Sequence, residues 1–278
     1  MENDNGVSLQ SKNIAFIGAG NMGEALVRGL LATKTVSASQ IIVTDVRAVR
    51  REHFAKTFGV RAVADNRQAV KAADIVVLAV KPQQVSEALL DFKWAMTDQK
   101  LIISIAAGVT TARIEQELGE RTHVIRAMPN TPALVGAGAA GVAKGAHATD
   151  DDLATAESIL RAVGICVRVD EKSIDAVTAL SGSGPAYFFY VTEAMIQAGV
   201  TAGLDRALAK RLAVQTLYGA AKLLVESGEE PDVLRRKVTS PGGTTEAAVK
   251  VMSERKLSSI FDEAMKAAEK RSQELSGS

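Results

Sequence analysis

Short apolar runs alternate with amphipathic stretches through the first half of the sequence, and this alternation restricts the fold more than any other feature. The strand candidates are Asn13–Gly18, Ile41–Asp45, Asp74–Val80, Leu101–Ile105 and His123–Ala127. The helical patterns between them include Asn21–Ala32, Arg47–Phe58 and Thr110–Leu118. Strands separated by helices of this length predict βαβ crossovers and a mainly parallel sheet. Because the strands are apolar at nearly every position, we expect helices to cover both faces of that sheet.

The second half of the sequence has a different pattern. A Gly/Ala-rich run at Gly136–Gly145, a helical pattern at Asp150–Val163 and a strand at Ile165–Val169 are predicted to extend the far edge of the sheet. From about Ser173 only helices are predicted, at Gly184–Ala202, Asp205–Ser227, Pro231–Val238, Thr244–Ser253 and Leu257–Leu275. A chain of 278 residues is long for one domain. We therefore expect a flexible leader (1–12), an α/β domain (13–172) and an all-α domain (173–278).

The long helical stretch Ala207–Val225 is apolar around much of its circumference. Its apolar residues include Leu208, Leu212, Val214, Leu217, Leu223, Leu224 and Val225. A helix that is apolar on most sides needs packing partners on most sides. A domain of about 100 residues offers few such partners, so a second subunit is the natural one. The sequence thus predicts a homodimer formed through its helical half.

Charge and cysteine content exclude several classes of protein. The 33 basic and 32 acidic residues leave a net charge of +1, which gives no electrostatic basis for binding nucleic acid or an anionic membrane. The sequence has no apolar run of the roughly 18 residues that span a bilayer, and residues 1–12 lack the apolar segment of a signal peptide. The single cysteine, Cys166, lies in an apolar run and fits a reducing compartment. We expect a cytoplasmic protein with no metal site.

A glycine motif follows the first predicted strand and opens the first predicted helix. It consists of Gly18, Ala19, Gly20, Asn21, Met22 and Gly23. In this context Gly18 makes a tight turn, Gly20 lets the backbone approach a pyrophosphate, and Gly23 lets the helix pack closely. The helix N-terminus offers free N–H groups and the positive end of its dipole to the phosphates. The motif predicts a Rossmann-type domain that binds a dinucleotide.

The residue at the end of the second strand, Asp45, bears on the choice of dinucleotide. An acidic residue there hydrogen-bonds the adenosine ribose and repels a 2′-phosphate, which favours NAD over NADP. Arg47, Arg50 and Arg51 follow closely, however, and could hold that phosphate. An alternative is that Asp45 caps the next helix. The sequence leaves the choice between NADH and NADPH open.

Two further segments end predicted strands, where open α/β sheets bind their ligands. The first consists of Ala79, Val80, Lys81 and Pro82, and the second is Ser104–Gly108, which includes Ala106. Their small side chains would let the nicotinamide half of the cofactor lie close to the backbone. Lys81 could contact a ribose or phosphate, or could simply lie on the surface.

Together these motifs resemble those of pyrroline-5-carboxylate reductases, the enzymes that make proline. The resemblance covers almost the whole chain after Lys12. It rests on Gly18–Gly23, Ala79–Pro82, Ser104–Val109, Arg126–Pro132, Ser181–Tyr187 and Ser240–Thr245. The segments Arg126–Pro132 and Ser240–Thr245 are far more specific than the glycine motif.

The resemblance implies a Rossmann domain followed by an all-helical dimerisation domain, with dimers assembled into rings, commonly decamers. The implied reaction is reduction of L-1-pyrroline-5-carboxylate to L-proline by NADPH or NADH. Thr245 matches the threonine that hydrogen-bonds the substrate ring nitrogen, and Asn66 matches an asparagine near the adenosine ribose or its phosphate. Many relatives carry a small hydroxyl residue where this sequence has Asp45, so the cofactor preference cannot be inherited.

The Ser240–Thr245 loop suits such a substrate. Pro241 and two glycines expose the backbone, and the following helix N-terminus can receive a carboxylate. We expect Ser240, Gly242, Gly243, Thr244 and Thr245 to bind the substrate, with the Thr245 hydroxyl orienting the imine nitrogen. The alternative is an ordinary turn between helices, capped by Thr244. Ser181–Tyr187 could line the cleft near the nicotinamide or pack one domain against the other.

Two other functions are compatible with this architecture. A 3-hydroxyacid dehydrogenase-like oxidoreductase needs a lysine as general acid or base in its helical half. Lysines are available there, but none lies in a small-residue loop suited to an active site. A non-catalytic NAD(P)-sensing protein is the second alternative, although such a protein needs no second ligand loop like Ser240–Thr245.

Overall fold

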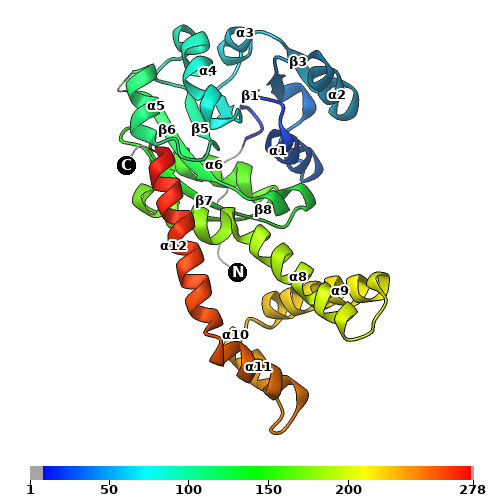
Figure 1. Cartoon of the computed structure of the whole chain (residues 1–278). Helices are drawn as coiled ribbons and strands as arrows, with labels where there is room; N and C mark the ends of the chain where they lie inside the picture. Colours follow the sequence, from blue (N-terminus) through cyan, green and yellow to red (C-terminus); the bar gives the residue numbers. More distant parts are fainter. Residues whose placement is uncertain (1–8, 120, 277–278) are drawn as a thin grey trace. The chain divides into compact units, whose positions relative to one another are not determined.

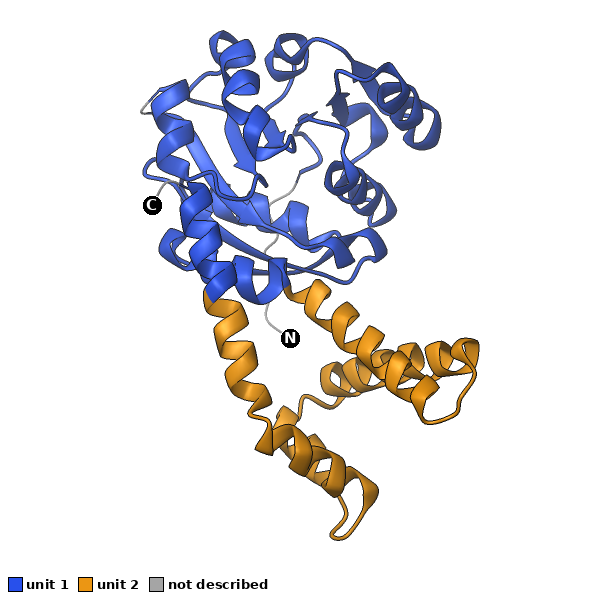
Figure 2. Ribbon diagram, in the orientation of Figure 1, with its two compact units in different colours: residues 1–183, 267–278 blue, residues 184–266 orange. Residues whose placement is uncertain are grey.

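The computed structural model describes residues 9–119 and 121–276. The chain divides into two compact units, shown in Figure 2: unit 1 runs to Ser183 and resumes at Ala267, and unit 2 is Gly184–Lys266. Unit 1 contains the sheet, and unit 2 is entirely helical. Among the described residues, no helix is both long and apolar enough to cross a membrane.

Unit 1 is built on one eight-stranded sheet with the order β3-β2-β1-β4-β5-β6-β7-β8 (Figure 1). The strands are β1 (Ile14–Ile17), β2 (Ile41–Thr44), β3 (Arg61–Val63), β4 (Ile75–Leu78), β5 (Leu101–Ser104), β6 (His123–Met128), β7 (Gly138–Lys144) and β8 (Gly164–Arg168). All neighbours are parallel except β6 and β7, which are antiparallel. In register, Ile14 of β1 lies between Ile41 of β2 and Ile75 of β4. The predicted mainly parallel sheet is confirmed.

Helices cover both faces of the sheet, as the apolar strands predict. They are α1 (Asn21–Ala32), α2 (Ala48–Phe58), α3 (Asn66–Lys71), α4 (Val85–Phe92), α5 (Thr111–Leu118) and α6 (Asp150–Arg161). Side chains alternate along β1, so Phe16 joins one buried cluster with residues of α1, α2 and α6. Ile17 joins a second cluster with residues of α3, α4 and α5. Each face of the sheet therefore has its own apolar core.

The predicted leader, residues 1–12, lies mostly outside the described residues. From Leu9 onward the chain is attached to unit 1, because Leu9 is buried and joins the first core cluster. The Gln40 side-chain amide donates to the carbonyls of Leu9, Gln10 and Lys12 at 2.9, 3.1 and 2.8 Å. Gln40 therefore fixes this short segment beside the start of β2.

Unit 2 is made of α8 (Gly184–Thr201), α9 (Arg206–Ser227), α10 (Pro231–Lys237), α11 (Thr244–Glu254) and the first part of α12 (Leu257–Ser276). Asp205 caps α9, since its side chain accepts from the N–H groups of Ala207 and Leu208. Pro231 occupies the first turn of α10. The predicted succession of helices is confirmed.

The division between the units falls at residues 183 and 184, later than the predicted boundary at 172 and 173. The reason is the short helix α7 (Ile174–Val177) and the π-helical turn Thr178–Gly182 that follows it. Ile174 and Ala179 are each only 1% exposed, so this segment packs within unit 1. The last part of α12, from Ala267, also belongs to unit 1.

Candidate active site

The glycine motif forms a tight turn between β1 and α1. Gly18 has φ +104°, a conformation that favours glycine, and a Cβ placed there would lie 2.7 Å from the Ala79 carbonyl oxygen. A Cβ on Gly23 would lie 2.9 Å from the carbonyl oxygen of Gly18. Gly20 is the N-cap of α1 and offers no side chain to the helix end. The N–H groups at the start of α1 are therefore left open to an anionic ligand.

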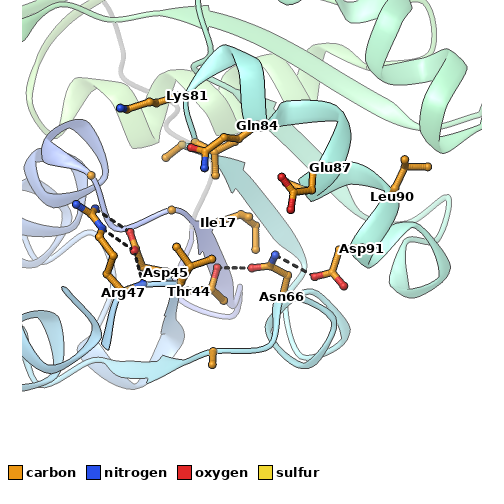
Figure 3. Close-up of a pocket in the computed structure, with 17 residues that line it drawn as sticks. Ile17, Thr44, Asp45, Arg47, Asn66, Lys81, Gln84, Glu87, Leu90 and Asp91 are labelled. Carbon is orange, nitrogen blue, oxygen red and sulfur yellow. Dashed lines mark hydrogen bonds and ion pairs between the residues drawn. The ribbon is translucent and has the colours of Figure 1, made fainter. Parts of the chain in front are cut away.

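A cavity of about 840 Å³ lies at the carboxyl ends of β1, β2, β3 and β4, which is within the usual size range of ligand sites (Figure 3). This is the point at which the strand order reverses, between β1 and β4. Of the predicted cofactor residues, eight line the cavity: Gly18, Gly20, Asp45, Arg47, Asn66, Ala79, Val80 and Lys81. The structure thus gathers residues from four separate loops at one site.

Six other predicted cofactor residues are not among those that line this cavity: Ala19, Asn21, Met22, Gly23, Pro82 and Ala106. Met22 packs against the first core cluster and Ala106 is buried in the second. Ala19 contributes through its backbone, because its N–H donates to Asp45 Oδ2 at 3.0 Å. Gly23 is buried, whereas Asn21 is exposed at the first position of α1.

Sequence reasoning missed the wall contributed by α4 and the turn before it. Gln84, Glu87, Ala88, Leu90 and Asp91 line the cavity, together with Ile17, Thr44, Val46 and Ala64. A signal was present: Val85, Leu89 and Phe92 are buried at helical spacing. That spacing predicts an amphipathic helix whose other face is free to meet a ligand.

Asn66 is held in place by hydrogen bonds from both sides (Figure 3). The Thr44 hydroxyl donates to Asn66 Oδ1 at 2.6 Å, and Asn66 Nδ2 donates to Asp91 Oδ2 at 3.0 Å. Asp65 caps α3 just before it, accepting from the N–H groups of Arg67 and Gln68. A preorganised amide beside the end of β2 fits a role in holding a ribose or phosphate.

Asp45 makes the densest set of polar contacts in the cavity. Its carboxylate accepts from the Ala19 N–H, from the Arg47 N–H at 2.9 Å, and from Arg47 Nε and Nη2 at 3.0 and 3.2 Å. Partial burial alone would raise the pKa of Asp45, but the hydrogen bonds from Arg47 and Ala19 together hold it below its ordinary value. The interpretation of Asp45 as a helix cap is wrong, because Arg47 is the N-cap of α2.

The Ser240–Thr245 loop of unit 2 leads into α11. Gly242 has φ +70°, and the Gly243 N–H donates to the Ser240 carbonyl at 3.0 Å, which closes a tight turn. Thr244 does not cap the helix, contrary to the alternative interpretation, because the N-cap is Gly243 and Thr244 is the first helical residue. The Gly242 N–H donates to Glu246 Oε2 at 2.8 Å. Thr245 is half-buried, and Gly242 and Gly243 line a cavity of about 720 Å³ within unit 2.

Two of the segments that carry the family resemblance, Arg126–Pro132 and Ser181–Tyr187, contact each other. Asn130 Nδ2 donates to the Ser181 carbonyl at 2.9 Å, and Asn130 Oδ1 accepts from the Ala139 N–H at 2.9 Å. A Cβ on Gly182 would lie 2.7 Å from Met128 Cε. The glycine at 182 therefore permits close packing of the π-helical turn on the end of β6, and π-helical turns are frequent at functional sites.

Comparison with known families agrees with this arrangement. A family model described as pyrroline-5-carboxylate reductase dimerisation matches residues 171–275, and one described as NADP oxidoreductase, coenzyme F420-dependent, matches residues 13–108. The chain is 45% identical over 268 residues to the pyrroline-5-carboxylate reductase of Pseudomonas aeruginosa, covering 96% of this chain and 98% of that protein. It is 40% identical to the Arabidopsis thaliana enzyme over 98% of both chains. The chain belongs to the pyrroline-5-carboxylate reductase family.

Solved structures of this reductase family share the whole fold. The Coxiella burnetii reductase superposes with a TM-score of 0.91 at 43% identity, covering 96% of this chain and 99% of that one. The Plasmodium falciparum reductase, solved with NADP bound, gives a TM-score of 0.85 at 28% identity, again covering 96% and 99%. The predicted Rossmann domain, dimerisation domain and use of NAD(P)H are confirmed.

Proposed function

We propose that this reductase converts L-1-pyrroline-5-carboxylate to L-proline, the last step of proline biosynthesis, with NADH or NADPH as reductant. The observation that supports the proposal most is the sequence identity of 40–45%, over nearly the full length, to pyrroline-5-carboxylate reductases. The cavity at the ends of β1 to β4 fits the required dinucleotide, because it joins an uncapped helix N-terminus to ribose-binding side chains.

The reaction depends more on how the protein positions the cofactor and the substrate than on acid–base chemistry by its side chains. The bound dinucleotide supplies a hydride to the imine carbon, and the ring nitrogen ends with one added proton. In unit 1, the glycine turn and Lys81 would hold the pyrophosphate, while Asp45 and Asn66 would hold the adenosine ribose. The other predicted cofactor residues would support the cofactor through their backbone and packing: Ala19, Asn21, Met22, Gly23, Pro82 and Ala106.

In unit 2, the loop before α11 would bind the substrate. The first N–H groups of a helix have no intrahelical acceptor, so those of Thr244 and Thr245 are suited to the substrate carboxylate. The Thr245 hydroxyl would hydrogen-bond the ring nitrogen and orient the imine carbon for attack. Ser240, Gly242 and Gly243 would shape the turn that presents these groups.

A test of this proposal measures the loss of nicotinamide absorbance with pyrroline-5-carboxylate, for the wild type and Thr245→Val. We expect rapid oxidation by the wild type and a loss of kcat/KM of roughly 10- to 100-fold in the variant, the effect of about one hydrogen bond to the reacting group. Thr201→Val is the matched control, because the Thr201 hydroxyl bonds only its own helix, at the Gln197 carbonyl. Unchanged turnover in Thr245→Val would remove the residue from the mechanism. Oxidation of a 3-hydroxy acid without imine reduction would support the dehydrogenase alternative.

We also infer that dimers formed through the helical region assemble into a decameric ring in the cytoplasm. The dimerisation family model supports the first step of this assembly. A single buried cysteine is consistent with a reducing compartment. Sedimentation should then give a mass ten times the 29.2 kDa of one chain, whereas a mass of twice that value would limit the assembly to dimers.

A further inference from the structure

We infer that Asp45 makes this reductase select NADH over NADPH, by occupying the place of a 2′-phosphate and by holding Arg47 away from one. The inference rests on the proposed function only in that the cavity of unit 1 binds the dinucleotide. It extends that function by specifying which of the two dinucleotides, NADH or NADPH, the cavity prefers. Sequence alone leaves the question open, because three arginines follow the acidic residue.

The position of Asp45 makes it a contact for the adenosine ribose. It follows β2 directly, lines the cavity, and accepts a hydrogen bond from Ala19 in the glycine turn. A carboxylate there accepts hydrogen bonds from the ribose hydroxyls of NADH. A 2′-phosphate has no such hydroxyl to donate and carries about two negative charges, so it meets repulsion at the same place.

Two of the three arginines are already engaged elsewhere. Arg51 Nη1 donates to the carbonyls of Asp45 and Val46 at 2.6 and 3.1 Å. Arg50 Nε donates to the Ala19 carbonyl and its Nη2 to Glu24, both at 2.7 Å, and its guanidinium lies over the Phe54 ring. Neither of these arginines lines the cavity. They brace the loops around it and are not placed to meet a phosphate.

Arg47 is the one arginine that lines the cavity among the described residues, and Asp45 engages it with both oxygens (Figure 3). A two-point pair of this kind is geometrically specific and directs the guanidinium away from other anions. To bind a 2′-phosphate, Arg47 would have to leave Asp45, and the carboxylate would then face the phosphate unpaired. Asp45 therefore disfavours NADPH in two ways: its charge repels the 2′-phosphate, and it occupies the arginine that could bind that phosphate.

The rest of the wall adds to the same preference. Glu87 and Asp91 line the cavity from α4, so the lining holds three carboxylates and two cations, Arg47 and Lys81. Asp91 is paired with Arg67 outside the lining, at 3.5 Å, so Glu87 is the carboxylate that adds most to the preference. The Plasmodium falciparum relative binds NADP on the same fold. The selectivity we infer is thus a property of these side chains and does not come from the scaffold.

The test is a fluorescence titration of the full chain with NADH and with NADPH, without substrate. We expect NADH to bind at least roughly 30-fold more tightly than NADPH, which corresponds to about 2 kcal/mol of the repulsion described. Asp45→Ser should raise the affinity for NADPH and lower that for NADH, each about tenfold, so that the preference reverses. Asp45→Asn keeps the shape and removes the charge, and should give an intermediate ratio. Glu52→Gln, which removes an exposed carboxylate of α2 outside the cavity, should leave the ratio within twofold.

A second substitution separates the two effects of Asp45. In the wild type, Arg47→Gln should change NADPH affinity less than threefold, because Asp45 already occupies the arginine. In the Asp45→Ser background, Arg47→Gln should abolish most of the gain in NADPH affinity. Equal binding of the two nucleotides by the wild type, or an unchanged ratio in Asp45→Ser, would overturn the inference. The predicted ratio without turnover of pyrroline-5-carboxylate would instead contradict the proposed function alone, and binding of neither nucleotide would overturn both.

Discussion

The two units of this reductase differ in how they bury their apolar side chains. Unit 1 encloses two clusters, with Phe16, Phe54 and Phe92 essentially inaccessible to solvent. In unit 2, all of whose residues are described, only Gly184, Thr192, Ala209 and Ala213 are buried. Unit 1 therefore has the core of an independent domain, whereas unit 2 has helices without a core.

The apolar residues of unit 2 are abundant, but they are exposed in a single chain. They include Phe188, Phe189, Tyr190, Leu208, Leu212, Tyr218, Leu223, Ile260 and Phe261. Burying one large side chain stabilises a protein by about 1.5–3 kcal/mol, so the same residues can supply the core of an interface. The dimerisation family model covers these helices. We therefore expect unit 2 to complete its core with a second copy of the chain.

The largest predicted effect comes from a charge placed in that shared core. Leu212 on α9 is half-exposed in the single chain, and Leu212→Glu puts a carboxylate where we expect the dimer interface to be apolar. Two copies would each lose about 2 kcal/mol of apolar burial, which raises the dimer dissociation constant roughly 1000-fold. Sedimentation at low micromolar concentration should then show monomers.

Gln215→Glu is the matched control, because it adds the same charge to α9 at a polar position. We expect it to remain associated at the same concentration. A Leu212→Glu protein that stays fully associated would place the dimer interface on other faces of unit 2.

The helices of unit 2 were predictable because their signals are local. Caps such as Asp205 and the long apolar periodicity set α9 within one residue of its observed bounds. Two short elements of unit 1, β3 and α3, were not predicted. β3 has only Arg61–Val63, half-exposed at the sheet edge, and α3 has one and a half turns, so neither gives a distinct periodicity.

The candidate site was predictable in part for the same reason. The glycine turn is a local motif, and its strand and helix flank it in the sequence. The contacts of Arg50 are not local, since they depend on the Ala19 carbonyl and on Glu24, which the fold brings close. The acidic wall of α4 likewise reaches the cavity only because β4 lies beside β1.

Unit 1 contains an ionic network around a buried arginine, and breaking that network is the second-largest effect that we predict. Arg126, 3% exposed, lies 3.6 Å from Glu171 and 3.4 Å from Asp175. The Ser272 hydroxyl of α12 donates to Asp175 Oδ1 at 2.7 Å, so the network ties the end of the chain to the sheet. Arg126→Met would remove the cation from the buried Asp175 carboxylate and from the partly exposed Glu171 carboxylate, at a cost of about 3 kcal/mol. The midpoint of thermal unfolding should fall by about 10 °C.

Lys56→Met is the control for this network, because it removes an ion pair to Glu52 in which both side chains are exposed. Such pairs contribute little, so we expect the midpoint to change by less than about 2 °C. Equal shifts in the two variants would mean that burial of the network adds nothing to the stability of unit 1.

The smallest predicted effect is an absence of reaction, and it tests whether unit 1 stays folded when unit 2 loses its partner. Burial, together with the nearby Glu157 carboxylate, raises the pKa of the Cys166 thiol from 9.0 to about 12. At pH 8 the reactive thiolate is then roughly a thousandfold scarcer than in an unfolded chain, and the sulfur is also shielded.

We expect a thiol reagent to leave Cys166 unlabelled in the wild type and in Leu212→Glu, with labelling only in denaturant. Between pH 8 and pH 9 the thiolate should rise to about half of the thiol in the denatured chain, whereas in the folded chain it should stay near roughly one part in a thousand, so labelling remains confined to the denatured chain. Rapid labelling of native Leu212→Glu would show that the core of unit 1 depends on the dimer, and that the two units do not differ in independence as their burial indicates.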